Sequence, residues 1–444
     1  MLKLLRSAFQ TRDIRSRLIY TFGIIWVVRF GSLLPTPGVN TSFISEWIAQ
    51  RGLGDAFNFF NAMTGGSFES LSILAMGVSP YITSSIIMQL LTIAIPALEE
   101  LQKDGEEGRK RIQEWTRYVT VALALVQSLA MSLGFGSSGY FITYNWQSVV
   151  VCVATMTAGS AFLMWCGERV TENGIGNGIS IILSVGILSR IPTDFMNLYT
   201  TFIWGQPIPI AILAVVLILA VILAMVIFVI ILQDGERKIP VQYSQKTQGR
   251  KNVGGQASHI PLKVNTAGVY PVIFASSLMQ FPVIISSFLG SAKSGDSATS
   301  IVDHIMRTLT YTMWLKPGQW WYSIGLIIYI ALIIGFAYFY TSVTFNPIEI
   351  ADNMKKQGGF VPGIRPGKPT SEYLSKILHY IIFVGAIGLI VISVIPIVFS
   401  GLFNAPSLSF SGTSLIIIVG VVLETLKQIE SLMVVRSYKG FLDY

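Results

Sequence analysis

Residues 208–232 read IPIAILAVVLILAVILAMVIFVIIL, and this run contains neither a charged nor a polar side chain. A helix of about 20 apolar residues is long enough to cross the hydrocarbon core of a bilayer. A helix of a soluble domain, by contrast, keeps a polar face toward water. The run therefore predicts a transmembrane helix, and the class of the whole chain follows from it.

The remainder of the chain has the same character. Of its 444 residues, 52% are apolar and 12% are charged, and the mean hydropathy is +0.62. Soluble domains carry about 25% charged residues, so a soluble globular chain and a disordered chain are both excluded. The apolar residues gather into ten predicted spanning helices, at 18–34, 73–95, 118–134, 147–166, 175–190, 208–232, 267–289, 322–344, 377–399 and 412–431.

The distribution of Lys and Arg predicts the orientation in the membrane. With ten crossings both termini lie on one side, and that side holds 25 of the 31 basic residues. The opposite loops hold five, and Arg29 lies within the first helix. The positive-inside rule assigns the first side to the cytoplasm. Residues 1–17 are basic, as in a signal peptide, but no small-residue cleavage site follows the apolar run, so we expect a retained helix.

Three segments between the predicted helices are unusual. The predicted cytoplasmic loops 233–266 and 345–376 are long, basic and rich in Pro and Gly. Their charge is either a topology signal or a docking surface for a large partner, since stiff turns with projecting Arg suit docking. The external stretch 35–72 is too apolar for a solvated loop and too interrupted to span. We expect it to fold back into the bundle.

The chain carries no motif typical of catalysis or metal binding. His-Glu-x-x-His, Gly-x-Ser-x-Gly and P-loop sequences are absent, and the three histidines are scattered. Cys152 and Cys166 lie about 21 Å apart along one predicted helix, which is too far for a disulfide. We therefore expect no enzyme activity, no metal and no cofactor.

Charged residues within the predicted helices are scarce. Besides Arg29 in the first helix, the charged residues are Glu424 and Lys427 in the last helix, which are three positions apart and can pair on one helical face. A secondary transporter with inverted repeats is the alternative function, and five plus five helices allow such repeats. It needs charged or ion-coordinating groups near the midplane, and their scarcity argues against it.

Seven motifs, in this order along the chain, resemble those of the SecY family (SecY/Sec61-alpha), the channel subunits of the Sec protein translocase. The resemblance extends over essentially the whole chain. The motifs are FNFFNAMTGG at 57–66, MGVSPYI at 76–82, SIIMQLL at 85–91, GIGNGIS at 174–180, HIPLKVN at 259–265, IFASS at 273–277 and FVPGIRPG at 360–367.

The resemblance implies an all-α polytopic membrane protein with ten transmembrane helices in two inverted five-helix halves around a central pore. The halves would be residues 1–190 and 191–444. The implied function is to pass unfolded secretory proteins across the membrane. Transmembrane segments would leave sideways into lipid, through a gate between the second and seventh helices. The implied location is the plasma membrane of a bacterium, with both termini cytoplasmic. The implied partners are SecE, SecG, the ATPase SecA, the ribosome, signal peptides, nascent or unfolded preproteins and membrane lipids.

The resemblance also implies four sets of functional residues. A pore ring would consist of Val78, Ile82, Ile179, Leu183, Ile273 and Ile417. Two pairs of these are spaced i, i+4, so each pair shares a helical face, and a constriction of aliphatic side chains excludes water and ions.

A plug at about 57–72 would include Phe57, Phe60, Met63, Gly65 and Gly66. The lateral gate would carry polar residues, some hydrogen-bonded across it: Thr83, Ser84, Gln89, Ser276 and Gln280. The docking contacts for SecA or the ribosome would be Arg250, Lys251, Arg365 and Lys368.

Overall fold

The computed structural model describes residues 9–41, 61, 64–136, 141–204, 207–243, 246–248, 251–253, 257–288, 301–310, 313–315, 320–403 and 411–439. Within these residues each of the ten predicted segments falls on a helix. Six of the described helices are long and apolar enough to cross a membrane, or seven if the bent pair α5 and α6 is counted as one span.

The first five predicted spans correspond to α2 and to α5–α9. Their bounds are α2 Arg12–Leu33, α5 Ser79–Ala94, α6 Pro96–Lys103, α7 Glu106–Gly136, α8 Trp146–Asn173 and α9 Gly178–Phe202.

The last five correspond to α10, α11, α13, α15 and α16. The helices of this part are α10 Ile208–Asp234, α11 Tyr270–Phe288, α12 Ile301–Leu309, a 3-10 turn Trp320–Ser323, α13 Ile324–Thr344, α14 Pro347–Lys356, α15 Lys368–Phe403 and α16 Ser411–Lys439.

The second span departs from its predicted bounds for a local reason at each end. Residues 73–78 form turns rather than helix, and Gly77 has a φ of +58°. At the other end Ile95 takes an extended conformation before Pro96, and the chain bends by 106° between α5 and α6. Proline disfavours the helical conformation in the preceding residue, so the helix breaks there.

The fifth span is longer than predicted. We expected it to end at Arg190, but α9 continues through Pro192 to Phe202. Its start is fixed by Asn177, whose side chain accepts hydrogen bonds from the backbone N–H groups of Ile179 and Ser180. Such capping satisfies N–H groups that have no partner inside the helix.

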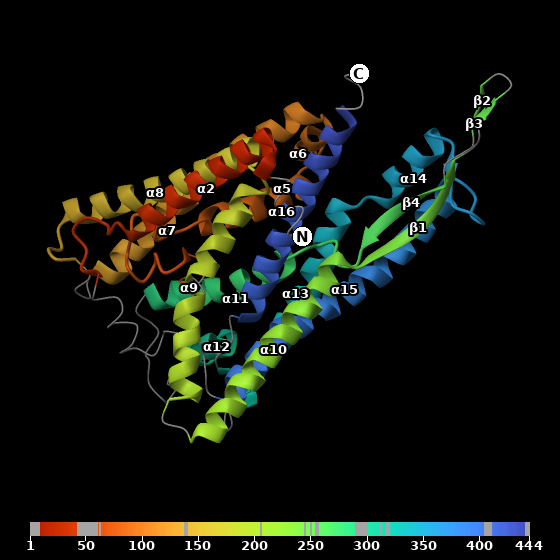
Figure 1. Cartoon of the computed structure of the whole chain (residues 1–444). Coiled ribbons are helices and arrows are strands. Elements are labelled where there is room, and N and C mark those ends of the chain that lie inside the picture. The colour runs from red at the N-terminus through yellow and green to blue at the C-terminus, as the bar shows by residue number, and fades with distance from the viewer. Residues whose placement is uncertain are drawn as a thin grey trace.

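The helices pack into two groups that meet along α16. In Figure 1, α2, α7 and α8 lie together on one side, and α10, α13 and α15 run together on the other. Helix α16 lies between the groups and packs against α9, α10 and α15. Helix α11 packs against α13 and also against α7, so it bridges the groups as well.

The two long basic loops, which the sequence predicts to be cytoplasmic, form one structure. Strands β1 (Glu236–Tyr243) and β4 (Ala257–Lys263) of the first loop pair antiparallel, with Ile239 opposite Ile260. Strand β5 (Gly359–Phe360) of the second loop pairs with the other edge of β1. Beyond this sheet lies the short pair β2 (Lys246–Gln248) and β3 (Lys251–Val253), which Figure 1 shows at the tip.

An apolar core holds this sheet onto the helices. The core consists of buried side chains from β1, β4, α14 and the first turns of α15, together with Val361. Its members are Ile239, Val241, Leu262, Met354, Val361, Leu374, Ile377 and Ile381. The sequence predicted two stiff, turn-rich loops but not their union, because the contacts join segments about 100 residues apart.

Candidate functional site

The six pore-ring residues lie in one apolar cluster. Leu183, Ile273 and Ile417 are buried there together with Val78, whereas Ile82 and Ile179 are partly buried and pack against it. The six come from the start of α5 and from α9, α11 and α16. Helical spacing in the sequence indicated only that Val78 and Ile82 share one face and that Ile179 and Leu183 share another. The tertiary structure brings both pairs together with Ile273 and Ile417.

The glycine-rich turn before α9 positions two of the six side chains. The N–H of Gly176 donates to Oε1 of Gln428 on α16, and the N–H of Gly178 donates to Oγ1 of Thr171 on α8 at 2.9 Å. A Cβ at Gly178 would overlap the carbonyl oxygen of Gly167. This close approach to α8 and α16 sets the start of α9, and therefore the place of Ile179.

The cluster separates two cavities of unequal size. On one side lies a cavity of about 500 Å³, whose wall includes Ile82, Ile179, Gln233 near the end of α10 and residues 417–427 of α16. On the other side a cavity of about 30 Å³ lies between Val78 and residues Thr64 and Ser67 of the external stretch. The large cavity has room for an extended chain, and the small one holds about one water molecule.

The described part of the external stretch is packed within the bundle. Phe68 and Leu71 are buried, and Gly65 and Gly66 adopt φ values of +66° and +89°. A Cβ at Gly65 would lie 2.7 Å from Nη1 of Arg29 and 2.9 Å from Cα of Gly186, so this turn lies directly against α2 and α9. The predicted plug residues Phe57, Phe60 and Met63 lie outside the described residues.

Three of the five predicted gate residues carry hydroxyls, and the hydrogen bonds of these three differ from the expected contacts across the gate. Ser84 donates to the carbonyl oxygen of Thr116 on α7 at 2.7 Å, and the Ser276 hydroxyl lies 3.3 Å from that of Tyr329 on α13. Thr83 donates to the carbonyl of Ser79 in its own helix. These three bonds do not cross from α5 to α11, because each hydroxyl finds a partner within its own group of helices.

Two gate residues remain. Gln89 lies on the wall of the large cavity, and its side chain is half-buried. The position of Gln280 falls within α11, but its side chain lies outside the described residues.

The predicted pair within the last helix is wrong. Nζ of Lys427 lies 2.6 Å from Oδ1 of Asp234, at the end of α10, rather than pairing with Glu424. Since α10 packs against α16, the carboxylate of Asp234 lies beside Lys427. Sequence spacing reports partners on one helix only, so it cannot reveal this contact.

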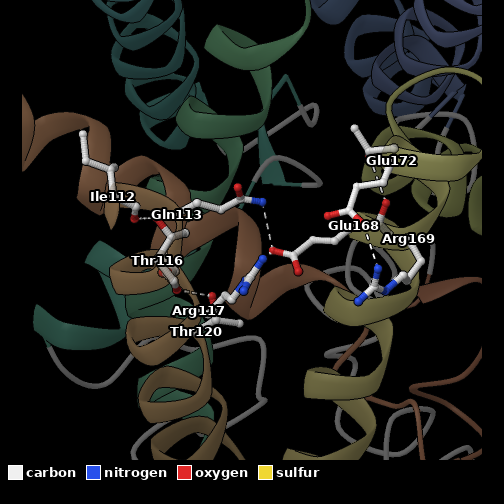
Figure 2. Close-up of polar contacts among 11 residues, drawn as sticks. Ile112, Gln113, Thr116, Arg117, Thr120, Glu168, Arg169 and Glu172 are labelled. Atoms are coloured by element: carbon white, nitrogen blue, oxygen red, sulfur yellow. Dashed lines mark hydrogen bonds and ion pairs between the residues drawn. The ribbon is translucent and has the colours of Figure 1, made fainter. Parts of the chain in front are cut away.

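A polar contact that the sequence did not reveal joins the first half of α7 to the last turns of α8. Oε1 of Glu168 lies 2.8 Å from Nε of Arg117 and accepts a hydrogen bond from Gln113 at 3.2 Å, as Figure 2 shows. In the same turn of α7, the carbonyl of Thr116 accepts from Thr120 at 2.6 Å as well as from Ser84. These bonds join α5, α7 and α8 into one unit.

Two of the four predicted docking residues can be placed in full. Both are exposed: Arg365 lies in the turn between β5 and α15, and Lys368 is the first residue of α15. The carbonyl of Arg365 accepts a hydrogen bond from Oγ1 of Thr370 at 2.8 Å, which holds the turn against the start of α15. Arg250 lies outside the described residues, and Lys251 lies on β3 with its side chain undescribed.

Comparison with known proteins shows the family to which a chain with this cluster, these cavities and this external stretch belongs. A family model described as SecY matches residues 72–426. The chain belongs to the SecY family. A relative named protein translocase subunit SecY, from Halalkalibacterium halodurans, is 42% identical over 448 residues, which cover 100% of this chain and 100% of the relative.

Solved channel structures share the fold. One concerns a SecY protein whose plug domain stabilises the closed state of the translocation channel and maintains a membrane seal. It has a TM-score of 0.61 at 17% identity, over 94% of this chain and 92% of that one. Another is Sec61 in the canine ribosome–channel complex from the endoplasmic reticulum, with a TM-score of 0.61 at 16% identity and the same coverage. This SecY-family chain is thus a ten-helix all-α membrane protein and the central channel subunit of the protein translocase.

Proposed function

We propose that the pore ring seals a passive channel that passes unfolded secretory proteins across the membrane. The observation that carries this proposal is one apolar cluster, built from α5, α9, α11 and α16, between a cavity of about 500 Å³ and one of about 30 Å³. Branched aliphatic side chains at a constriction exclude water and ions. They also lack directional bonds, so they accept most passing sequences.

The segment at about 57–72 acts as a plug on the outer side of the ring. Its described residues support this role, because Thr64 and Ser67 leave only the small cavity beneath Val78. The contact of Gly65 with α2 and α9 holds the segment in its resting place. An entering chain displaces it.

The lateral gate opens between α5 and α11. Ser84 is bonded to α7 and Ser276 to α13, so separation of α5 from α11 breaks neither of these hydrogen bonds. Buried polar groups therefore keep their partners while the gate is open, which lowers the cost of opening. An apolar segment in the pore then partitions into lipid through this seam.

The two halves, residues 1–190 and 191–444, move relative to each other during opening. On the cytoplasmic side they remain joined where the turn before α9 meets Gln428 of α16. Both termini are cytoplasmic, and the membrane is the plasma membrane of a bacterium, as the distribution of basic residues and the bacterial relatives suggest.

The cytoplasmic sheet is the docking surface for the partner that drives translocation, either SecA or the ribosome. Its exposed Arg365 and Lys368 and the basic residues Arg250 and Lys251 supply positive charge. Phosphates of ribosomal RNA attract such cations, and the similar Sec61 channel was solved in a ribosome complex. SecE and SecG are the expected membrane subunits, and signal peptides, preproteins and lipids are the expected ligands.

The test combines preprotein import with resting conductance in reconstituted membranes. Ile82→Asn with Ile179→Asn places two amides in the constriction, and these hydrate it, so resting channels should leak ions in planar bilayers. Leu188→Asn is the control, since Leu188 on α9 is 52% exposed and outside the cluster. Equal resting currents in both variants would mean that the ring is not the seal. Uptake of a small solute without preprotein import would instead support a transporter.

A further inference from the structure

Four carboxamide side chains stand on the wall of the large cavity, close to the pore ring. They are Gln89 on α5, Asn177 at the start of α9, Gln233 near the end of α10, and Asn265 in the turn before α11. We call these four residues the amide collar. Each comes from a different element, so no local sequence pattern accounts for their meeting around one cavity.

Two of the four carboxamides, those of Asn265 and Gln233, have an NH2 group without a hydrogen-bond partner among the described residues. Asn265 is only 5% exposed, yet its Nδ2 is buried without a hydrogen-bond partner among the described residues. Nε2 of Gln233 is in the same condition. Asn177 uses its Oδ1 to cap α9, which leaves its Nδ2 free of that role. Buried polar groups in native proteins nearly always have partners, so donors left over beside a cavity point to a ligand.

We propose that the amide collar binds the main chain of the polypeptide in transit, a role that rests on the proposed channel function. A carboxamide offers both an N–H donor and a C=O acceptor, as a peptide group does. Every residue except proline presents both groups on its main chain. The collar therefore binds extended chains whatever their side chains.

The position of the collar beside the pore ring explains what this binding accomplishes. The aliphatic ring excludes water and offers no hydrogen bonds, so peptide groups that reach it lose their water partners, which is unfavourable. The amides supply replacement partners on the cytoplasmic side of the ring. The amides are uncharged, so the collar itself does not select by substrate charge. The charged residues on the same wall, Lys263, Glu424 and Lys427, include both signs, and Lys427 is paired with Asp234.

The test uses preproteins arrested in the assembled translocase, reconstituted in vesicles, with either a Gly-Ser or a Gly-Pro stretch held in the channel. Each proline removes one main-chain N–H donor. The measured quantity is the rate at which the arrested chain slides back after ATP is removed. The variant is Gln89→Met with Gln233→Met, two half-exposed side chains whose length methionine preserves. Asn265→Leu is a further variant.

The expected result is a change in the ratio of the two sliding rates, Gly-Ser against Gly-Pro, between the unaltered and the altered channel, as in a double-mutant cycle. In the unaltered channel the Gly-Ser stretch should slide back about tenfold more slowly than the Gly-Pro stretch. The Gly-Pro stretch lacks two or three of the main-chain hydrogen bonds to the collar that the Gly-Ser stretch makes. The Gln89→Met/Gln233→Met channel should lose most of this ratio. The control Gln147→Met, which removes an exposed carboxamide at the start of α8 outside the cavity, should retain it.

An unchanged ratio in the glutamine double variant overturns the amide collar while leaving the channel function in place. Asn265 is buried, so Asn265→Leu can lower the amount of assembled channel. In that case the test rests on the glutamine double variant alone, because half-exposed side chains are replaced with less effect on folding. Failure of the unaltered channel to import any preprotein contradicts the proposed channel function itself.

Discussion

Gly178→Ala should loosen the seal without altering any pore-ring side chain. The added Cβ would overlap the carbonyl oxygen of Gly167 and lie 2.7 Å from Cβ of Val170, so the start of α9 must move away from α8. Overpacking of this kind costs about 1–3 kcal/mol. Strain on the 2.9 Å bond from the Gly178 N–H to Thr171 adds about 1 kcal/mol. The higher helix propensity of alanine offsets at most about 1 kcal/mol of this. The net decrease in the free energy of unfolding is therefore about 1–3 kcal/mol.

The displacement bears on the channel because Ile179 follows directly. In the present packing a Cβ at Gly167 would lie 2.8 Å from Cγ1 of Ile179, so the two helices have no slack at this point. We therefore expect a lower apparent Tm of the purified complex and a measurable resting ion current in planar bilayers. The two effects should occur together, since both arise from the same shift of α9.

Gly335→Ala is the matched control. Gly335 lies in α13, and a Cβ there would meet nothing within 4 Å. Alanine favours the helix over glycine by up to about 1 kcal/mol, so this variant should keep or slightly raise the apparent Tm. It should show no resting current. If Gly178→Ala and Gly335→Ala behave alike in both assays, the close approach of α8 and α9 does not position the ring, and the reasoning is refuted.

Two further predictions concern the docking surface and the plug. Arg365→Lys should slow SecA-driven preprotein import into vesicles while assembly and resting conductance stay unchanged, because only the planar guanidinium makes two parallel hydrogen bonds; import at the normal rate would reduce Arg365 to a topology signal. Gly65→Ala should raise resting conductance more than Gly66→Ala, since both residues have positive φ but only at Gly65 would a Cβ meet Arg29 and Gly186. Equal currents in the two glycine variants would exclude a tight plug contact at Gly65.

The resemblance of short motifs to a known family went further than pattern analysis. It named six residues that the structure brings into one apolar cluster, whereas helical spacing supported only the pairs Val78/Ile82 and Ile179/Leu183. Pattern analysis nevertheless placed all ten helical segments, with errors at their ends. The end of α5 could have been found, because Pro96 marks it, but the continuation of α9 through Pro192 could not, since packing overrides the local preference there.

The sequence by itself determined the spanning segments and the absence of familiar catalytic motifs, and it predicts the orientation, because a bilayer selects for long apolar runs and for basic residues on one side. The tertiary structure decided which groups meet. It paired Lys427 with Asp234, bonded Ser84 to α7 and Ser276 to α13, and joined two distant loops into one sheet. In a bundle where every helix is apolar, hydrophobicity does not specify a neighbour. Close glycine contacts and a few polar bonds between helices do so instead, and their partners lie far apart in the chain.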